Sequence, residues 1–318
     1  MDRTPLGKVH RSALIGTKAF TPVTIPASPF MTKLGYGTGV NVYRFKRSSI
    51  EGKSPWAVKK VNPKARPGIS ERLALEASIL KDLNHPNIVG FRALIGNTNG
   101  DLCLAMEDCH MSLMDKIEER SYLEEKFVPK EIFAVAWAIG NALEYLHFEK
   151  KILHGDMKSG NILIRGPFES VKLCDFGVAL RLKGDLSGLL DPKGRYIGSE
   201  PWKSKEALNR GGVVCDKTDI FAYGLVIWEM LALDVPHVSL LGTDGSMDTD
   251  MSCEEDSEEY TAALGTRPPL PKENYDQSFN PLIELFDWCT AEDPRDRPSA
   301  RQVVDFLKPH IMTLSKDC

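Results

Sequence analysis

The stretch HGDMKSGN at residues 154–161, followed by ILI at 162–164 and DFG at 175–177, is the most specific signal in the chain. It places Asp156 and Asn161 five positions apart, directly before an apolar run that is typical of a strand. A second aspartate, Asp175, follows that strand. This spacing of carboxylate and amide side chains predicts one half of a catalytic site.

The other half is predicted upstream, where LGYGTGVNV at residues 34–42 joins two expected strands through glycines. Backbone without Cβ can close over phosphates where a side chain would collide. Alone, the same glycines are explained equally well by a hairpin turn. On the next expected strand, however, Lys59 supplies a cation for nucleotide phosphates. Glu76, on the helix that follows, is its expected partner because neither charge is stable there unpaired.

Three downstream segments follow in a fixed order. GSEPW at 198–202 precedes Glu206, Asp219 precedes an apolar helix predicted over 220–233, and DPRDRP lies at 293–298. Together with the upstream motifs they resemble the eukaryotic protein kinase superfamily, over roughly residues 30–309. The resemblance implies an α+β fold with two lobes, a small β-rich N-lobe and a larger α-helical C-lobe.

The resemblance also assigns roles in phosphoryl transfer from ATP with Mg2+ to protein substrates. Asp156 is the expected catalytic base, Lys158 lies near the γ-phosphate, and Asn161 acts with them. Asn161 and Asp175 are the expected magnesium ligands. The residues expected to bind ATP are Leu34, Gly35, Gly37, Gly39, Val42, Ala57, Lys59, Glu76, Met106, Glu107, Cys109 and Asp175.

Within that set, Met106 closes an apolar strand and is the expected gatekeeper beside the adenine, while Glu107 and Cys109 are expected to offer backbone hydrogen bonds to the base. Glu206 and Arg297 are expected to form a buried ion pair that anchors the substrate-binding segment. His154 is interpreted as a packing and hydrogen-bonding anchor without a catalytic role.

A narrower resemblance rests on SPFM at 28–31, GTGVNVY at 37–43, SPWAVKK at 54–60 and ALGTRPP at 263–269. These stretches are similar to a mitosis-linked branch of serine/threonine kinases related to the mitogen-activated protein kinase kinases. The branch implies basic proteins or mitogen-activated protein kinases as substrates. Lys158, two residues after Asp156, favours serine/threonine over tyrosine, with dual specificity left open.

Three features depart from the general kinase pattern. Val40 stands where a third glycine is usual, which predicts a stiffer loop over the phosphates. Gly155 replaces the arginine that commonly pairs with a phosphorylated activation loop, so control by loop phosphorylation is not expected. Ser204 and Lys205 precede Glu206 in place of the usual Ala-Pro.

The predicted organisation is a mobile N-terminal tail at 1–29, a kinase domain at 30–309 and a C-terminal tail at 310–318. Within the domain the N-lobe covers 30–106, the hinge 107–112 and the C-lobe 113–309. A helix is expected at about 70–83 in the N-lobe. Residues 242–259 contain eight acids and no Lys or Arg, which predicts an extended, solvated insert.

Composition excludes several other classes of protein. Acidic residues outnumber basic ones 44 to 40, so no general attraction to nucleic acid is expected. No stretch is apolar enough to cross a membrane, and no secretory signal is present. The seven cysteines lack the paired spacing of zinc sites and are interpreted as reduced thiols. We therefore expect a cytoplasmic or nuclear protein.

Two alternative functions share parts of this pattern. His154, Asp156 and Asn161 also occur in small-molecule phosphotransferases, although Lys158 and the segment from Gly198 to Glu206 favour a protein kinase. A pseudokinase scaffold is the non-enzymatic alternative, suggested by the altered glycine loop and by Gly155. Retention of every catalytic group argues against it.

Regulation and partners are predicted from the tails and the insert. Thr4-Pro5, with Lys8 following, is the expected target of an upstream proline-directed kinase. The acidic insert is expected to aid solubility, with recruitment of basic partners as the functional alternative. The terminal residues 315–318 lack the bulky aliphatic end that PDZ domains favour, so PDZ binding is not expected.

Overall fold

The computed structural model describes residues 31–37, 40–45, 55–62, 68–96, 102–241 and 258–314, with main chain alone for 31–37. Several predicted features lie outside these residues: the tail at 1–29 with Thr4, Gly39 of the glycine loop, positions 242–257 of the acidic insert, and the end at 315–318. The description below concerns the described residues only.

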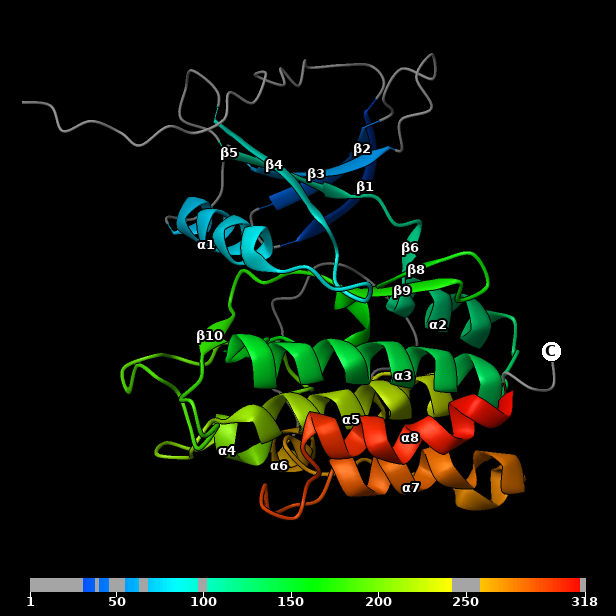
Figure 1. The fold of residues 1–318 in the computed structure, drawn as a ribbon. Helices are drawn as coiled ribbons and strands as arrows, with labels where there is room; N and C mark the ends of the chain where they lie inside the picture. The colour runs from blue at the N-terminus through cyan, green and yellow to red at the C-terminus, as the bar shows by residue number, and fades with distance from the viewer. Residues whose placement is uncertain are drawn as a thin grey trace, which may run out of the picture.

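The N-terminal part is an antiparallel sheet of five strands in the order β1-β2-β3-β5-β4, with one helix, α1, beside it (Figure 1). Their bounds are β1 Met31–Gly37, β2 Val40–Phe45, β3 Trp56–Val61, α1 Ile69–Asp82, β4 Phe91–Gly96 and β5 Leu102–Glu107. Helix α1 buries Leu73, Ala77 and Leu80 on one face, as their spacing predicts. It begins and ends one residue earlier than predicted.

The C-terminal part is mostly helical and is joined to the sheet through the segment after β5 (Figure 1). Its helices are α2 Leu113–Tyr122, α3 Pro129–Glu144, α4 Lys205–Leu208, α5 Asp216–Ala232, α6 Glu258–Ala263, α7 Asn280–Cys289 and α8 Ala300–Leu314, with a π-helical turn at Tyr145–Lys150. Its short strands are β6 Met111–Ser112, β7 Ile152–Leu153, β8 Ile162–Arg165, β9 Ser170–Leu173 and β10 Leu180–Arg181. The structure thus confirms the predicted α+β class with two lobes.

Local chemistry explains where two of these helices begin. Ser112 and Asp115 form a reciprocal capping box at the start of α2, with hydrogen bonds of 3.1 and 3.0 Å. Helix α3 starts with Pro129, whose missing N–H costs nothing in the first turn, and Glu131 accepts from the N–H of Val128.

Helix α5 is the centre of the C-terminal core, because it is buried on all sides from Ile220 to Leu231. Its Tyr223 hydroxyl donates to the carbonyl of Ala136 on α3 at 2.9 Å. The sequence-based start at 220 was wrong: the helix begins at Asp216. The first turn is polar, so the apolar pattern does not reveal the start of the helix. Thr218 caps this turn, because its side chain accepts from the Cys215 N–H.

Two further boundaries differ from the predictions. Glu258 and Glu259, assigned to the extended acidic insert, form the first turn of α6, where carboxylates interact favourably with the helix dipole. Helix α8 continues through Pro309 to Leu314, so the predicted domain end at 309 falls inside it. Within the predicted hinge, Met111 and Ser112 form strand β6. No helix in the described ranges has the length and apolar character needed to span a membrane.

Candidate functional site

A cavity of about 330 Å3 lies where the sheet meets the helical part. The predicted site residues that line it are Val42, Ala57, Lys59, Glu76, Met106, Cys109, Asn161 and Asp175. Val40, which replaces the usual glycine, also lines it. Leu34, Gly35 and Gly37 lie on strand β1, next to β2. The structure therefore brings most of the predicted base- and phosphate-binding residues around one cavity.

The segment after β5 is held from both lobes. The guanidinium of Arg44 on β2 donates to both carboxylate oxygens of Asp108 at 3.1 and 3.0 Å. Lys172 on β9 contacts the Glu107 carboxylate at 3.1 Å. The N–H of Glu107 donates to the carbonyl of Gly90, so its position is fixed by the sheet as well. These contacts orient the main chain that reaches the cavity at Cys109. Glu107, predicted to contact the base, lies between Met106 and Asp108 and is not among the residues that line the cavity.

Lys59 on β3 is buried and contacts two carboxylates. Its Nζ lies 2.9 Å from Glu76 Oε2 on α1 and 2.9 Å from Asp175 Oδ1. Burial alone would lower the pKa of Lys59, but the charges of Asp175 and Glu76 outweigh it and raise that pKa. Burial also raises the pKa of Asp175, yet the Lys59 ammonium overcomes this and lowers it below its ordinary value. For Glu76, burial and the neighbouring Asp175 charge outweigh the Lys59 ammonium and raise the pKa to about 7. The ammonium thus stabilises both carboxylates, which repel each other.

Asp156 and Asn161 lie in the loop between β7 and β8. The Asn161 amide donates to the main-chain oxygen of Asp156 at 2.7 Å and to its Oδ2 at 3.0 Å. The Lys158 Nζ lies 3.2 Å from the same Oδ2. Oδ1 of Asp156 has no hydrogen-bond partner among the described residues. One carboxylate oxygen is thus held by cationic and amide donors, while the other is buried. Asp156 lines the same cavity as Lys158 and Ser199.

Asp219 on α5 fixes the main chain of this loop through hydrogen bonds. Its carboxylate accepts from the N–H groups of His154 at 2.8 Å and Gly155 at 3.0 Å, and it contacts His147 Nε2 at 2.9 Å. The His154 ring packs edge-on against Phe176 and its Nε2 lies 2.9 Å from the Cys174 carbonyl. His154 therefore joins the Asp156 loop to the Asp175 loop, as an anchor would.

Gly155 has φ +78°, a conformation that residues with Cβ seldom adopt. A Cβ at this position would also lie 3.0 Å from the main-chain oxygen of Val178. The glycine in place of the usual arginine is thus required by the local backbone.

Asn161 and Asp175 offer the oxygen atoms that Mg2+ prefers. The described residues contain no group of three or more His, Cys, Asp or Glu side chains arranged to hold a metal. Two protein ligands suit a magnesium ion that completes its octahedral shell with phosphate and water oxygens. The residues present therefore fit a magnesium site that forms together with a bound nucleotide.

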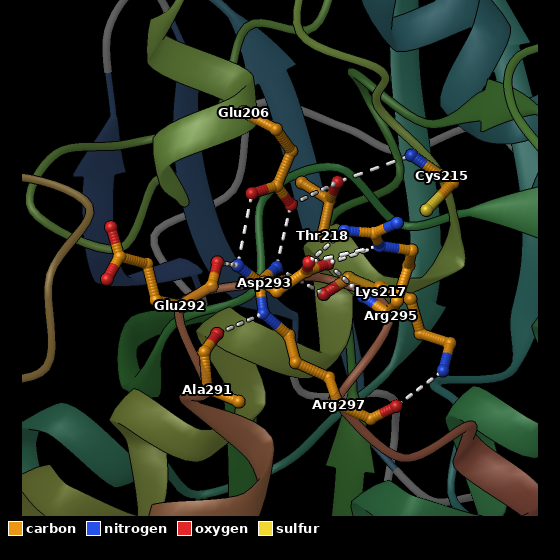
Figure 2. Close-up of polar contacts among 9 residues, drawn as sticks. All are labelled: Glu206, Cys215, Lys217, Thr218, Ala291, Glu292, Asp293, Arg295 and Arg297. Atoms are coloured by element: carbon orange, nitrogen blue, oxygen red, sulfur yellow. Dashed lines mark hydrogen bonds and ion pairs between the residues drawn. The ribbon is translucent and has the colours of Figure 1, made fainter.

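The segment from Gly198 to Glu206 closes the site. Lys158 Nζ donates to Ser199 Oγ at 2.6 Å, so one cation contacts both Asp156 and this segment. The far end is held by Glu206, whose carboxylate pairs with Arg297 at 2.7 and 3.1 Å (Figure 2). Burial raises the pKa of Glu206, but the hydrogen bonds and charge of Arg297 outweigh it and lower that pKa.

Arg297 is fully buried, and all its donors are used. Besides Glu206 it donates to the carbonyls of Ala291, Lys217 and Glu292 at 2.8 to 3.1 Å (Figure 2). The Thr218 hydroxyl donates to Glu206 at 3.1 Å. The predicted pair is therefore the centre of a network that ties the substrate-binding segment to α5 and to the segment before α8.

One buried residue of the site was missed by sequence reasoning. Glu229, near the end of α5, accepts from the Ser159 hydroxyl at 2.5 Å and from the Trp202 indole N–H at 2.8 Å. Burial raises its pKa to about 7, against the hydrogen bonds from these two residues. The available signal was a single acidic residue inside a long apolar helix, which needs an internal partner.

A family model described as "Protein kinase domain" matches residues 29–306. The chain belongs to the protein kinase family. The match covers the sheet, the cavity and nearly all of the helical part. Every kinase motif from the glycine loop to the segment at 293–298 lies inside the matched range.

Individual relatives agree with this assignment. The kinase is 49% identical to human lymphokine-activated killer T-cell-originated protein kinase over 97% of this chain and 98% of that protein. This match confirms the resemblance predicted from the four stretches between residues 28 and 269, and the link to mitosis stays a prediction. The kinase is 27% identical to serine/threonine-protein kinase CTR1 of Arabidopsis thaliana, over 74% of this chain and 26% of that protein. Mitogen-activated protein kinase kinase kinase 7 of Bos taurus is also 27% identical, over 82% of this chain and 41% of that protein.

The buried ion pair predicts a large loss of stability when one partner is removed. Arg297→Met should lower the free energy of unfolding by about 3–5 kcal/mol, because Glu206 would remain as an uncompensated buried charge. The control is Arg301→Met, which breaks an exposed pair with Glu144 and should cost at most about 1 kcal/mol. Urea unfolding measures both, and equal losses would contradict the anchoring role.

Glu229 predicts a specific pH dependence of stability. Between its ordinary pKa of 4.5 and about 7, the folded state keeps a proton that the unfolded state releases. The free energy of unfolding of the wild type should therefore fall relative to Glu229→Gln as pH rises from 5 to 7, by on the order of 3 kcal/mol, and then level off. Urea unfolding of both proteins at pH 5 to 8 measures this difference. A constant difference across that range would show that Glu229 does not bind the proton.

Proposed function

We propose that this kinase transfers the γ-phosphate of ATP to serine and threonine hydroxyls of protein substrates. The observation that carries the proposal is the position of Lys158, whose ammonium contacts both Asp156 and Ser199. A substrate hydroxyl placed beside the Asp156 carboxylate would then lie between a proton acceptor and the segment that holds the polypeptide substrate. The names of the serine/threonine kinase relatives support the same assignment.

The roles of the other residues follow from charge and position. Lys59, held by Glu76, faces the α- and β-phosphates, and the main chain at Glu107 and Cys109 faces the adenine. Bound magnesium supplies neutralisation of phosphate charge, with Asn161 and Asp175 as its protein ligands. Asp156 accepts the proton of the hydroxyl that attacks the γ-phosphorus, and Lys158 stabilises the negative charge that develops on the transferred group.

The substrate class follows from the geometry around Ser199. Lys158 occupies the space between Asp156 and the substrate-binding segment, which suits a short aliphatic hydroxyl better than a long phenol. We infer serine and threonine preference from this contact. The link to mitotic signalling, and the expected basic or mitogen-activated protein kinase substrates, remain predictions of the sequence resemblance.

Substitution of the three charged groups should separate their roles. Asp156→Asn should reduce phosphoryl transfer by about 100- to 10,000-fold while ATP affinity stays near that of the wild type. Lys59→Met should weaken transfer through phosphate positioning, and Asp175→Asn through loss of a magnesium ligand. Transfer to myelin basic protein and ATP titration calorimetry measure the two quantities.

The matched control is Lys60→Met, which removes the adjacent lysine on β3. Lys60 lies on the opposite face of the strand, over the Tyr43 ring. It should retain wild-type transfer. Full turnover in all three charged-group variants would exclude these residues as the catalytic groups. Absence of transfer by the wild type would leave a scaffold.

The gatekeeper assignment has a separate test. Met106 is buried on β5 opposite Ala57 and lines the cavity, so Met106→Gly should open space for an enlarged base. The variant should accept ATP that carries a benzyl group on its exocyclic amine, which the wild type should reject. Met111→Gly, which shortens another methionine of the cavity, should not. Equal exclusion of the analogue by all three proteins would contradict this placement.

A further inference from the structure

Glu229 lies beneath the substrate-binding segment without touching the open part of the site. A cavity of about 560 Å3 on the substrate side is lined by Asp156, Lys158, Ser199 and Trp202, among others. Glu229 does not line it and is 1% exposed. Any effect of Glu229 on substrates must therefore pass through the residues that it contacts.

Those contacts close a ring. Lys158 binds Ser199, the carbonyl of Ser199 accepts from the N–H of Trp202, and the Trp202 indole donates to Glu229. Glu229 in turn accepts from Ser159, the residue that follows Lys158 in the chain. The substrate-binding segment is thus attached to the catalytic loop at two points, one through Ser199 and one through Trp202.

The two attachments differ in their surroundings. Lys158 keeps 26% of its side chain exposed and faces the position of the transferred phosphate, so its ammonium is shared with the reactants. Ser159 and Glu229 are buried and Trp202 is 8% exposed. In this dry environment hydrogen bonds are strong and an unpaired donor is costly. The buried attachment therefore keeps the segment in place while the exposed one changes partners.

The hydrogen-bond chemistry of Glu229 preserves the attachment in both protonation states. An indole N–H can only donate, so Oε2 of Glu229 accepts from Trp202 whether or not the residue is ionised. A hydroxyl can donate or accept, so a proton added to Oε1 would simply reverse the bond to Ser159. A glutamine could make the same two contacts, whereas an aliphatic residue could make neither.

We propose that Glu229 is a positioning residue for the protein substrate, which acts by holding Trp202 against the catalytic loop through Ser159. This inference rests on the proposed phosphoryl transfer. It separates the two substrates, because the chain of contacts leads to Ser199 and Trp202. These two residues line the cavity on the substrate side and do not line the cavity at Met106 and Cys109 that is expected to hold the adenine. Loss of Glu229 should therefore weaken productive binding of protein and spare that of ATP.

The test compares Glu229→Leu with Glu229→Gln, using myelin basic protein and ATP as the two substrates. Glu229→Leu should raise KM for the protein by about tenfold with KM for ATP within twofold of the wild type, and Glu229→Gln should restore KM for the protein to within threefold. Tyr223→Phe is the control for general damage to α5. Tyr223 lies on the same helix as Glu229, and the substitution removes its buried hydrogen bond to Ala136 on α3. It should leave both KM values within twofold.

Ser159→Ala provides a second test if Glu229→Leu fails to fold, since it removes one bond and a single oxygen atom. It should raise KM for the protein about threefold and leave KM for ATP unchanged. The positioning role would be overturned if KM for the protein were unaltered in Ser159→Ala and Glu229→Leu. It would also be overturned if KM for the protein and KM for ATP rose equally. A wild type that transfers no phosphate would instead overturn the proposed function.

Discussion

The buried ammonium of Lys59 is the constraint on which the two-part architecture depends. A cation in this position is stable only if carboxylates reach it, and they come from separate parts of the chain: Glu76 from α1 and Asp175 from the loop after β9. The contact therefore holds α1 against the sheet and the sheet against the helical part at once. Any movement that withdrew α1 would separate Glu76 from its cation and leave Lys59 with Asp175 as its carboxylate partner, so the helix position and the charge state of the cavity are coupled.

A second buried charge organises the opposite side of the site. Asp219 accepts from two consecutive main-chain N–H groups, at His154 and Gly155, and so fixes the loop that carries Asp156 to the first turn of α5. Helix α5 also holds Glu229, and Thr218 in its first turn touches the Glu206 pair. The same rigid helix thus positions the catalytic loop and the substrate-binding segment. This arrangement explains why a mostly apolar helix contains buried acids at its start and its end.

Periodicity and spacing predicted much of this structure and missed the parts made by long-range polar contacts. The apolar face of α1, the lysine on a strand after the glycine loop and the Glu206 pair with Arg297 follow from local patterns or from the resemblance. The start of α5 was missed because its polar first turn is buried by tertiary contacts. Glu229 was missed because its partners lie 27 and 70 positions away, a distance at which the sequence has no periodic signal.

Gly155 shows how one local constraint shapes the remainder of the site. An arginine here would need a left-handed backbone at a cost of about 1–3 kcal/mol, and its Cβ would press against the oxygen of Val178. The loop could accept that residue only after moving, and Asp219 holds it in place through the Gly155 N–H. The loop geometry therefore disfavours a phosphate-binding arginine at this position. The substrate-binding segment must be held by other contacts, and the described residues supply them at Ser199, Trp202 and Glu206, with partners already present in the unmodified chain.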